Sequence, residues 1–156
     1  MTTTADLRLD HLAIAARYAA APDQWPVAPR FDPADRWYHR IGDGPGYEVW
    51  LLTWLPGQGT DLHDHGGSAG AFQVLSGTLT EDTVIGGTPA RITARELGEG
   101  AGRRFGRRHV HRITNRSTRP AISIHVYGPA LNTMTRYRVG TGGLEVLTVD
   151  RSGVQW

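Results

Sequence analysis

Histidine is the residue type that offers the most chemistry in this sequence. The 156 residues include seven histidines and no cysteine, and two histidine pairs, His63/His65 and His109/His111, are each separated by one residue. Side chains two residues apart on a β-strand point to the same face, so each pair can converge on one ion. Imidazole nitrogen is a good ligand for zinc, copper, iron and nickel. Although such pairs also occur as plain surface histidines, the spacing suggests a metal site, to which either member of the second pair can contribute.

The residues around the first histidine pair narrow this interpretation. Gly57 lies six residues before His63, and Gly77 lies twelve residues after His65. This layout resembles the first signature motif of the cupin superfamily, G-x5-H-x-H-x3,4-E-x6-G. Gly70 stands at the place of the motif's glutamate. The resemblance therefore implies a site that lacks the usual carboxylate ligand.

The second cupin motif ends in H-x3-N, and His111 followed by Asn115 resembles it. The resemblance selects His111 as the third metal ligand beside His63 and His65, with His109 close by as a neighbour. Three neutral ligands leave the charge of a divalent ion uncompensated. Such a site favours an anionic incoming ligand, for which a thiolate is well suited.

Four segments extend the resemblance to the cysteine dioxygenase family, particularly its bacterial members. They are Tyr38-His39-Arg40, Leu62-His63-Asp64-His65, the stretch from His111 to Asn115, and Ser123-Ile124-His125-Val126-Tyr127. The family implies Fe(II) as cofactor, L-cysteine and O2 as substrates, and cysteine sulfinic acid as product. It also implies that Tyr127, His125 and Ser123 are catalytic and that Tyr38 and Arg40 bind substrate.

The spacing of Ser123, His125 and Tyr127 agrees with these roles. The three residues alternate, so they share one face of a strand, while the apolar residues between them face the opposite way. A serine, a histidine and a tyrosine in a row can form a hydrogen-bonded relay in which each member orients the next. We expect the tyrosine hydroxyl to lie beside the metal and its ligands.

Arg40 is the expected clamp for the substrate carboxylate. A guanidinium matches a carboxylate with two parallel hydrogen bonds and stays charged at every relevant pH. In the family, arginine at this place goes with cysteine and glutamine goes with 3-mercaptopropionate. The cysteine that forms a thioether with the tyrosine in mammalian members corresponds to Gly70, so this chain cannot form that crosslink.

The elements that position these residues are mostly strands. Residues Thr4–Ala20 read as one amphipathic helix, with Thr3 and Asp6 as its N-terminal capping signal. The proline-rich stretch Ala21–Pro33 reads as a loop. From Trp37 onward the pattern becomes β-like, with short apolar runs separated by glycine and proline turns. The expected strands are Glu48–Trp54, Ala71–Ser76, Thr78–Val84, Ala90–Glu96, His109–Asn115, Ala121–Tyr127 and Leu144–Val149.

These elements predict an all-β fold: a cupin-type jelly-roll barrel with the N-terminal helix packed outside. The apolar stripe expected to hold the helix in place consists of Leu9, Leu12, Ala13, Ala16 and Ala20. We expect residues 1–156 to form one cupin domain, with 1–33 as a helical and loop extension and 34–156 as the barrel. The length suits a single domain.

Composition excludes several classes of function. Without cysteine there are no disulfides, cysteine-ligated zinc sites, iron–sulfur clusters or cysteine nucleophiles. All 17 basic residues are arginine, which excludes Schiff-base chemistry on lysine and a P-loop lysine. The formal charge is only +2, so we expect no nucleic-acid partner, and we interpret the basic cluster at Arg103, Arg104, Arg107 and Arg108 as solvated.

The sequence contains no signal-peptide pattern and no apolar run of 18 residues. We therefore expect a cytoplasmic protein without a membrane partner, and a monomer. Three alternatives to a cysteine dioxygenase stay open. They are a dioxygenase of 3-mercaptopropionate or another small thiol, a non-catalytic cupin that binds a metal or ligand, and a cupin isomerase or sugar-modifying enzyme, which generally keeps the glutamate that Gly70 replaces.

Overall fold

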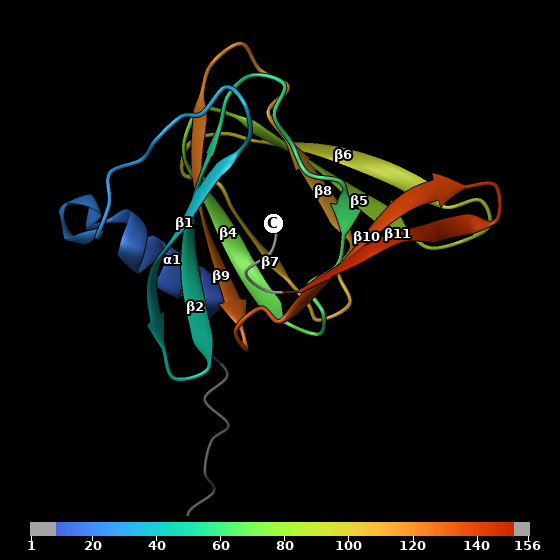
Figure 1. Cartoon of the computed structure of the whole chain (residues 1–156), viewed down its shortest axis with the longest axis horizontal. Coiled ribbons are helices and arrows are strands. Elements are labelled where there is room, and N and C mark those ends of the chain that lie inside the picture. Colours follow the sequence, from blue (N-terminus) through green and yellow to red (C-terminus); the bar gives the residue numbers. More distant parts are fainter. Residues whose placement is uncertain (1–8, 152–156) are drawn as a thin grey trace, which may run out of the picture.

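The computed structural model describes residues 9–151 and consists mostly of antiparallel strands in two sheets (Figure 1). The five-stranded sheet has the order β1-β2-β9-β4-β7, and the six-stranded sheet has the order β11-β10-β3-β8-β5-β6. The strands of the first sheet are β1 (Trp37–Gly44), β2 (Tyr47–Trp54), β9 (Ala121–Gly128), β4 (Ala69–Ser76) and β7 (Gly102–Phe105). Those of the second are β11 (Gly143–Arg151), β10 (Thr133–Gly140), β3 (Leu62–His63), β8 (His111–Thr114), β5 (Leu79–Ile85) and β6 (Arg91–Leu97).

The predicted all-β class is confirmed. All seven expected strands are present, and their ends differ from the expected ones by at most two residues. Strands β1, β3, β7 and β10 were not marked out individually in the sequence. Two of them, β3 and β7, have only two and four residues, too short for an alternating pattern to be visible.

The helix α1 (His11–Ala19) packs outside the barrel, against β4, β7 and β9 of the five-stranded sheet (Figure 1). The expected start was wrong: Asp10 is the N-cap, and its carboxylate accepts a hydrogen bond from the backbone N–H of Ala13. Positions 4–8 and the expected cap at Thr3 lie outside the described residues. A 3₁₀ turn, η1 (Pro22–Gln24), follows within the predicted loop.

The buried stripe of α1 also differs from the expected one. Ile14 and Ala15 are buried, whereas Ala13, Ala16 and Ala20 are exposed. The more buried positions recur at 11, 14, 15, 18 and 19, which is the same 3.6-residue period in another phase. No described helix has the length and apolar character needed to span a membrane.

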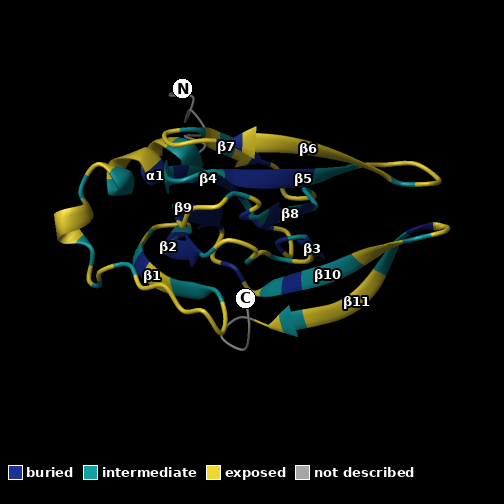
Figure 2. Cartoon of the chain, turned by 90° about the horizontal axis from the view of Figure 1, so that it is seen from above, coloured by how far each residue is buried: buried dark blue, intermediate teal, exposed yellow. Residues whose placement is uncertain are grey.

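Two apolar clusters hold the fold together, one on each face of the five-stranded sheet. The outer cluster lies under α1 and includes Ile14, Val49, Leu51, Ile124 and Val126. The inner cluster fills the space between the two sheets and contains larger side chains, among them Trp54, Phe72, Leu79 and Phe105. Figure 2 shows hairpins β5–β6 and β10–β11 extending from the barrel at the end away from α1, with many exposed residues.

Candidate metal centre

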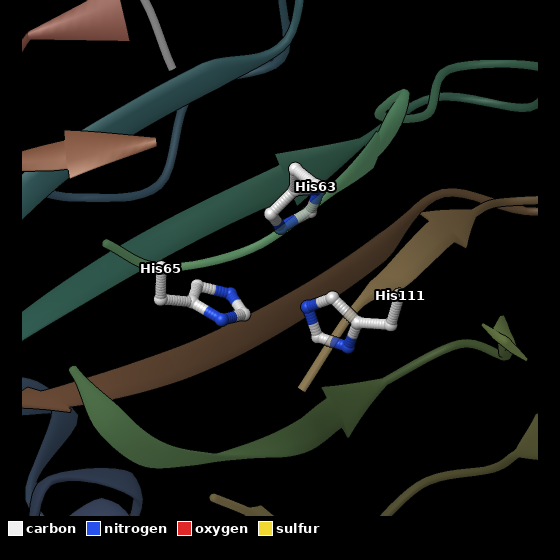
Figure 3. A group of neighbouring side chains, drawn as sticks. All are labelled: His63, His65 and His111. Carbon is white, nitrogen blue, oxygen red and sulfur yellow. The ribbon is translucent and has the colours of Figure 1, made fainter. Parts of the chain in front are cut away.

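Three histidines meet between the two sheets. His63 lies at the end of β3, His111 at the start of β8, and the two are directly paired across the strands. His65 follows the end of β3. The ring centroids of the three lie 4.8 to 4.9 Å apart in all three pairings, and one ligand nitrogen of each lies within 4.8 Å of the others. All three side chains are buried, and the rings turn toward a common centre (Figure 3).

Asp64, which lies between His63 and His65, has its carboxylate directed to strand β10. Its carboxylate accepts hydrogen bonds from the Tyr137 hydroxyl at 2.7 Å and the Thr135 backbone N–H at 3.0 Å. These contacts tie Asp64 to strand β10 on the far side from the histidines. One difference from the expectation concerns the backbone, because only His63 belongs to a strand and His65 is directed inward by the segment after it.

Hydrogen bonds orient two of the three rings. The Nδ1 atom of His63 lies 2.8 Å from the carbonyl oxygen of Asp61, and the Nδ1 atom of His111 lies 2.8 Å from a carboxylate oxygen of Glu81. Both partners can only accept, so each Nδ1 carries the proton and each Nε2 keeps its lone pair. Burial lowers the pKa of both imidazoles, which keeps them neutral. Neutral imidazole with a free Nε2 is the form that binds a metal ion.

His65 is held differently from the other two. Its ring stacks on Phe105 with the centroids 4.5 Å apart, and neither ring nitrogen has a hydrogen-bond partner among the described residues. Burial lowers the pKa of His65 well below its ordinary value, so the ring is neutral. A buried polar atom without a partner costs about 1–3 kcal/mol. A metal ion bound among the three histidines would give one of the two His65 nitrogens a partner. The donor set therefore fits a metal.

A chamber opens beside the histidines. Its walls include His63 and His111, and on the opposite sheet His125 and Tyr127. Most of the remaining wall is apolar or aromatic, with Trp50, Leu52 and Met134 among the contributors. The chamber is therefore mostly apolar, with a few polar groups near the histidine cluster, as is usual for small-molecule sites.

Strand β9 contributes the expected row of Ser123, His125 and Tyr127. The hydroxyl oxygen of Ser123 lies 2.9 Å from Nε2 of His125, and Nδ1 of His125 lies 3.4 Å from the hydroxyl oxygen of Tyr127. The Tyr127 ring lies 5.4 Å from the His65 ring. The row thus begins in the core at Ser123 and ends beside the metal ligands.

Burial determines the protonation of this row. It lowers the pKa of His125 to about 3 and raises the pKa of Tyr127, so both groups are neutral at physiological pH. Tyr127 therefore retains a hydroxyl proton. The tyrosine can donate that proton in a hydrogen bond to a ligand in the chamber.

The two expected substrate-binding residues on β1 are placed differently. Tyr38 lines the chamber. Arg40 pairs across the strands with Trp50, so its backbone position faces the chamber side, but its guanidinium is 56% exposed and lies 3.9 Å from Asp43. Arg40 is not among the residues that line this chamber, and its role as the carboxylate clamp stays a prediction. The β-bulge at Ile41, directly after Arg40, marks the place where the strand leaves the regular register.

Two other arginines line the chamber instead. The guanidinium of Arg136, on β10, is paired with Asp150 at 2.5 Å. Arg36 lies just before β1, and its guanidinium carbon is 5.2 Å from the centroid of the Trp54 ring. Burial lowers the pKa of Arg36, but a guanidinium stays charged. Arg36 is two residues before Tyr38, and this spacing was the signal in the sequence that places both on one face.

Sequence reasoning also missed Glu81 and misjudged Arg103. Glu81 lies on β5, is 1% exposed, and contacts His109, His111 and Arg103. Arg103 was expected to be solvated, but its Nε–H donates to Glu81 at 2.7 Å. Strand β5 reads Leu-Thr-Glu-Asp-Thr-Val-Ile, and this pattern does not distinguish Glu81 from an exposed carboxylate.

Gly70 lies on β4, beside both β9 and β7. A Cβ at this position would overlap the carbonyl oxygen of Val126 and come within 2.8 Å of the Phe105 ring. Phe105 is the ring on which His65 stacks. Glycine here is therefore what allows β4, β9 and Phe105 to pack closely next to the histidines.

Two antiparallel sheets with a histidine cluster between them are the arrangement predicted for a cupin barrel, and comparison with solved structures agrees. The protein TT1209 from Thermus thermophilus superposes with a TM-score of 0.57 and 22% identity, over 65% of this chain and 90% of that one. A cupin superfamily protein from Desulfitobacterium hafniense superposes with a TM-score of 0.53 and 8% identity, over 64% and 83% of the two chains. At these identities the likeness concerns the fold alone, and the predicted cupin barrel is confirmed.

Sequence comparison identifies the family. The family model described as cysteine dioxygenase type I matches residues 4–139, so the chain belongs to that family. The human cysteine dioxygenase type 1 is 27% identical over 145 residues, which cover 88% of this chain and 72% of the human protein. The rat enzyme of the same name is 26% identical over 154 residues, with the same coverage. The expected enzyme class, a thiol dioxygenase, is thereby confirmed.

Proposed function

We propose that this protein is an iron(II) enzyme that oxidises L-cysteine with O2 to cysteine sulfinic acid. The observation that carries the proposal is a cluster of three buried, neutral histidines, two of which share a mostly apolar chamber with a protonated tyrosine. Family membership supports thiol oxidation, and the three-histidine donor set supports a divalent metal. Both oxygen atoms of O2 end on sulfur, so the thiolate is oxidised by four electrons and no external reductant is needed.

In this proposal His63, His65 and His111 hold the metal by their free imidazole nitrogens. Iron(II), when bound, supplies the redox chemistry that makes O2 reactive toward a thiolate. The protein's own contribution is to bind and orient the substrate in the chamber. The three neutral ligands leave a net positive charge at the centre, which attracts the thiolate.

Tyr127 would donate its hydroxyl proton in a hydrogen bond toward the reacting groups, and His125 and Ser123 would hold it in place. The short Ser123–His125 contact makes this row rigid at its inner end, while the longer His125–Tyr127 contact leaves the tyrosine some freedom.

The substrate carboxylate requires a cation, and we propose Arg36 for this role. Its side chain lies on the chamber wall, two residues before Tyr38, which lines the same chamber. Arg40 would have to turn away from Asp43 to reach the same ligand. Tyr38 lies between the two arginines in sequence and on the chamber wall, where its hydroxyl can support the carboxylate.

The test is oxygen uptake by anaerobically iron-loaded protein with L-cysteine, 3-mercaptopropionate and cysteamine compared side by side. We expect one O2 consumed per sulfinate formed and a preference for L-cysteine. Preference for 3-mercaptopropionate would replace the proposed substrate but retain the site. No uptake with any thiol by the iron-loaded protein would contradict the proposal and favour a binding function.

Two neighbouring substitutions supply the matched control. His65→Ala removes a proposed ligand, so we expect loss of both iron and oxygen uptake. Asp64→Asn changes the adjacent residue, whose carboxylate faces β10, so iron content should persist. Equal iron content in both variants would contradict the assignment of His65.

A further inference from the structure

The barrel contains a buried carboxylate that has no role in the proposed reaction. Glu81 lies on β5 in the six-stranded sheet and is 1% exposed. One of its oxygens lies 2.8 Å from Nδ1 of His111 and 3.2 Å from Nε2 of His109. The other accepts a hydrogen bond from Nε of Arg103 at 2.7 Å. Both oxygens therefore have partners: one contacts His109 and His111, and the other accepts from Arg103 on β7.

The position of Glu81 relative to the ring of His111 decides what it can do. It contacts Nδ1, while the other ring nitrogen points toward His63 and His65 (Figure 3). A carboxylate on that side cannot reach the shared centre of the three histidines. It does, however, require the proton of His111 to be on Nδ1, and it increases the electron density on the nitrogen that faces the metal.

The neighbours of Glu81 restrain it in this position. Arg103 belongs to β7 of the five-stranded sheet, whereas Glu81 and His111 belong to the six-stranded sheet. The carboxylate thus connects the two sheets at the level of the metal centre. Burial alone would raise the pKa of Glu81, but hydrogen bonds from His109, His111 and Arg103 outweigh it, so the group is ionised.

We propose that Glu81 is a positioning residue for the metal ligand His111, and that Arg103 and His109 fix Glu81 in turn. The inference rests on the proposed metal site at His63, His65 and His111. It assigns to this chain a carboxylate that is hydrogen-bonded to a metal ligand, whereas Gly70 stands where the cupin motif has a glutamate as a direct ligand. It also explains the second histidine pair: His111 serves as the ligand, and His109 holds the group behind it.

The main test measures metal affinity without turnover. Cobalt(II) is titrated into the metal-free protein against a competing chelator, and its visible absorption bands are recorded. Glu81→Gln keeps the length of the side chain but removes its charge, and we expect about 10- to 100-fold weaker binding with altered bands. Glu96→Gln, an exposed glutamate on the neighbouring strand β6, is the matched control and should bind like the unaltered protein.

Two results would overturn the proposal. One is a folded Glu81→Gln variant with unchanged cobalt affinity and unchanged bands. The other is an equal loss of affinity when Glu81→Gln is added to His111→Ala, because a positioning effect requires His111 to be present. A protein that binds cobalt as expected but oxidises no thiol would contradict the proposed function and leave this inference standing.

A second measurement needs no substitution and covers the case in which Glu81→Gln does not fold. Nitrogen-15 NMR of the histidine side chains in the metal-free protein reports which ring nitrogen carries the proton. We expect the Nδ1–H form for His111, with a strongly downfield-shifted proton shared with Glu81. The Nε2–H form at His111 would contradict the proposal.

Discussion

The indole nitrogen of Trp54 lies 2.9 Å from the hydroxyl oxygen of Ser123. Because an indole N–H can only donate, Ser123 accepts from Trp54, and its own buried proton is directed to the acceptor that it touches, Nε2 of His125. The histidine then carries its proton on Nδ1 and faces the oxygen of Tyr127. In this order of donors the tyrosine proton stays available to the chamber. Trp54 therefore sets the direction of the whole row from its inner end.

Ser123→Ala tests this order. The substitution leaves the buried Trp54 N–H without its acceptor, so we expect the free energy of unfolding to fall by about 1–3 kcal/mol. It also removes the donor to Nε2 of His125, so the proton of His125 is no longer held on Nδ1. We also expect kcat to fall while iron affinity stays the same. Urea denaturation and steady-state kinetics measure the two effects. Ser76→Ala, on strand β4, is the control, since this serine has no side-chain hydrogen bond within the described chain; equal effects of both substitutions would contradict the proposed order.

The two arginines near Tyr38 give a comparison within one segment. If Arg36 holds the substrate carboxylate, Arg36→Gln should raise KM for L-cysteine by about 10- to 100-fold, as expected for loss of a charged hydrogen bond. Arg40→Gln removes an exposed cation and should change KM little. Cysteamine, which lacks the carboxylate, should respond to neither substitution. A raised KM in Arg40→Gln alone would show that Arg40 turns inward and is the clamp.

Gly70→Ala tests the close packing beside the metal centre. The added methyl group would overlap Val126 and contact Phe105, so we expect a loss of about 1–3 kcal/mol in unfolding free energy and a displaced His65. Gly98→Ala is the control, because a Cβ there meets nothing within 4 Å. Thermal denaturation compares the two variants. A Gly70→Ala variant as stable as the Gly98→Ala variant would contradict this explanation of the glycine.

The pH dependence of stability follows from the buried His125. Its pKa is about 3 in the folded protein and near 6.5 when unfolded, so the unfolded state binds more protons between these values. The contribution is fully present above pH 6.5 and is lost as the pH falls toward 3, at about 1 kcal/mol per pH unit. His125→Gln should show a shallower decline of unfolding free energy between pH 6 and pH 4. Identical slopes in urea denaturation would contradict the buried, neutral state.

The residues that lie close together in sequence could be predicted without the structure. The His63/His65 spacing, the H-x3-N element at His111 and the alternation of Ser123, His125 and Tyr127 each depend on which face of a short extended segment a side chain occupies. That property follows from the period of two in a β-strand. For the same reason, the seven expected strands were found close to their observed ends.

The roles of Glu81, Trp54 and Arg36 became visible only in the tertiary structure. Glu81 and Arg103 come from different sheets, and Trp54 reaches Ser123 across paired strands. Arg40 and Arg36 share one strand face in sequence, but Arg36 lines the chamber, whereas the exposed guanidinium of Arg40 lies 3.9 Å from Asp43. By itself, the sequence determined which side chains within one short segment share a face, as in the His63/His65 pair and the row Ser123, His125 and Tyr127. Which of them touch was decided by sheet pairing and side-chain packing, because these contacts join residues that are far apart along the chain.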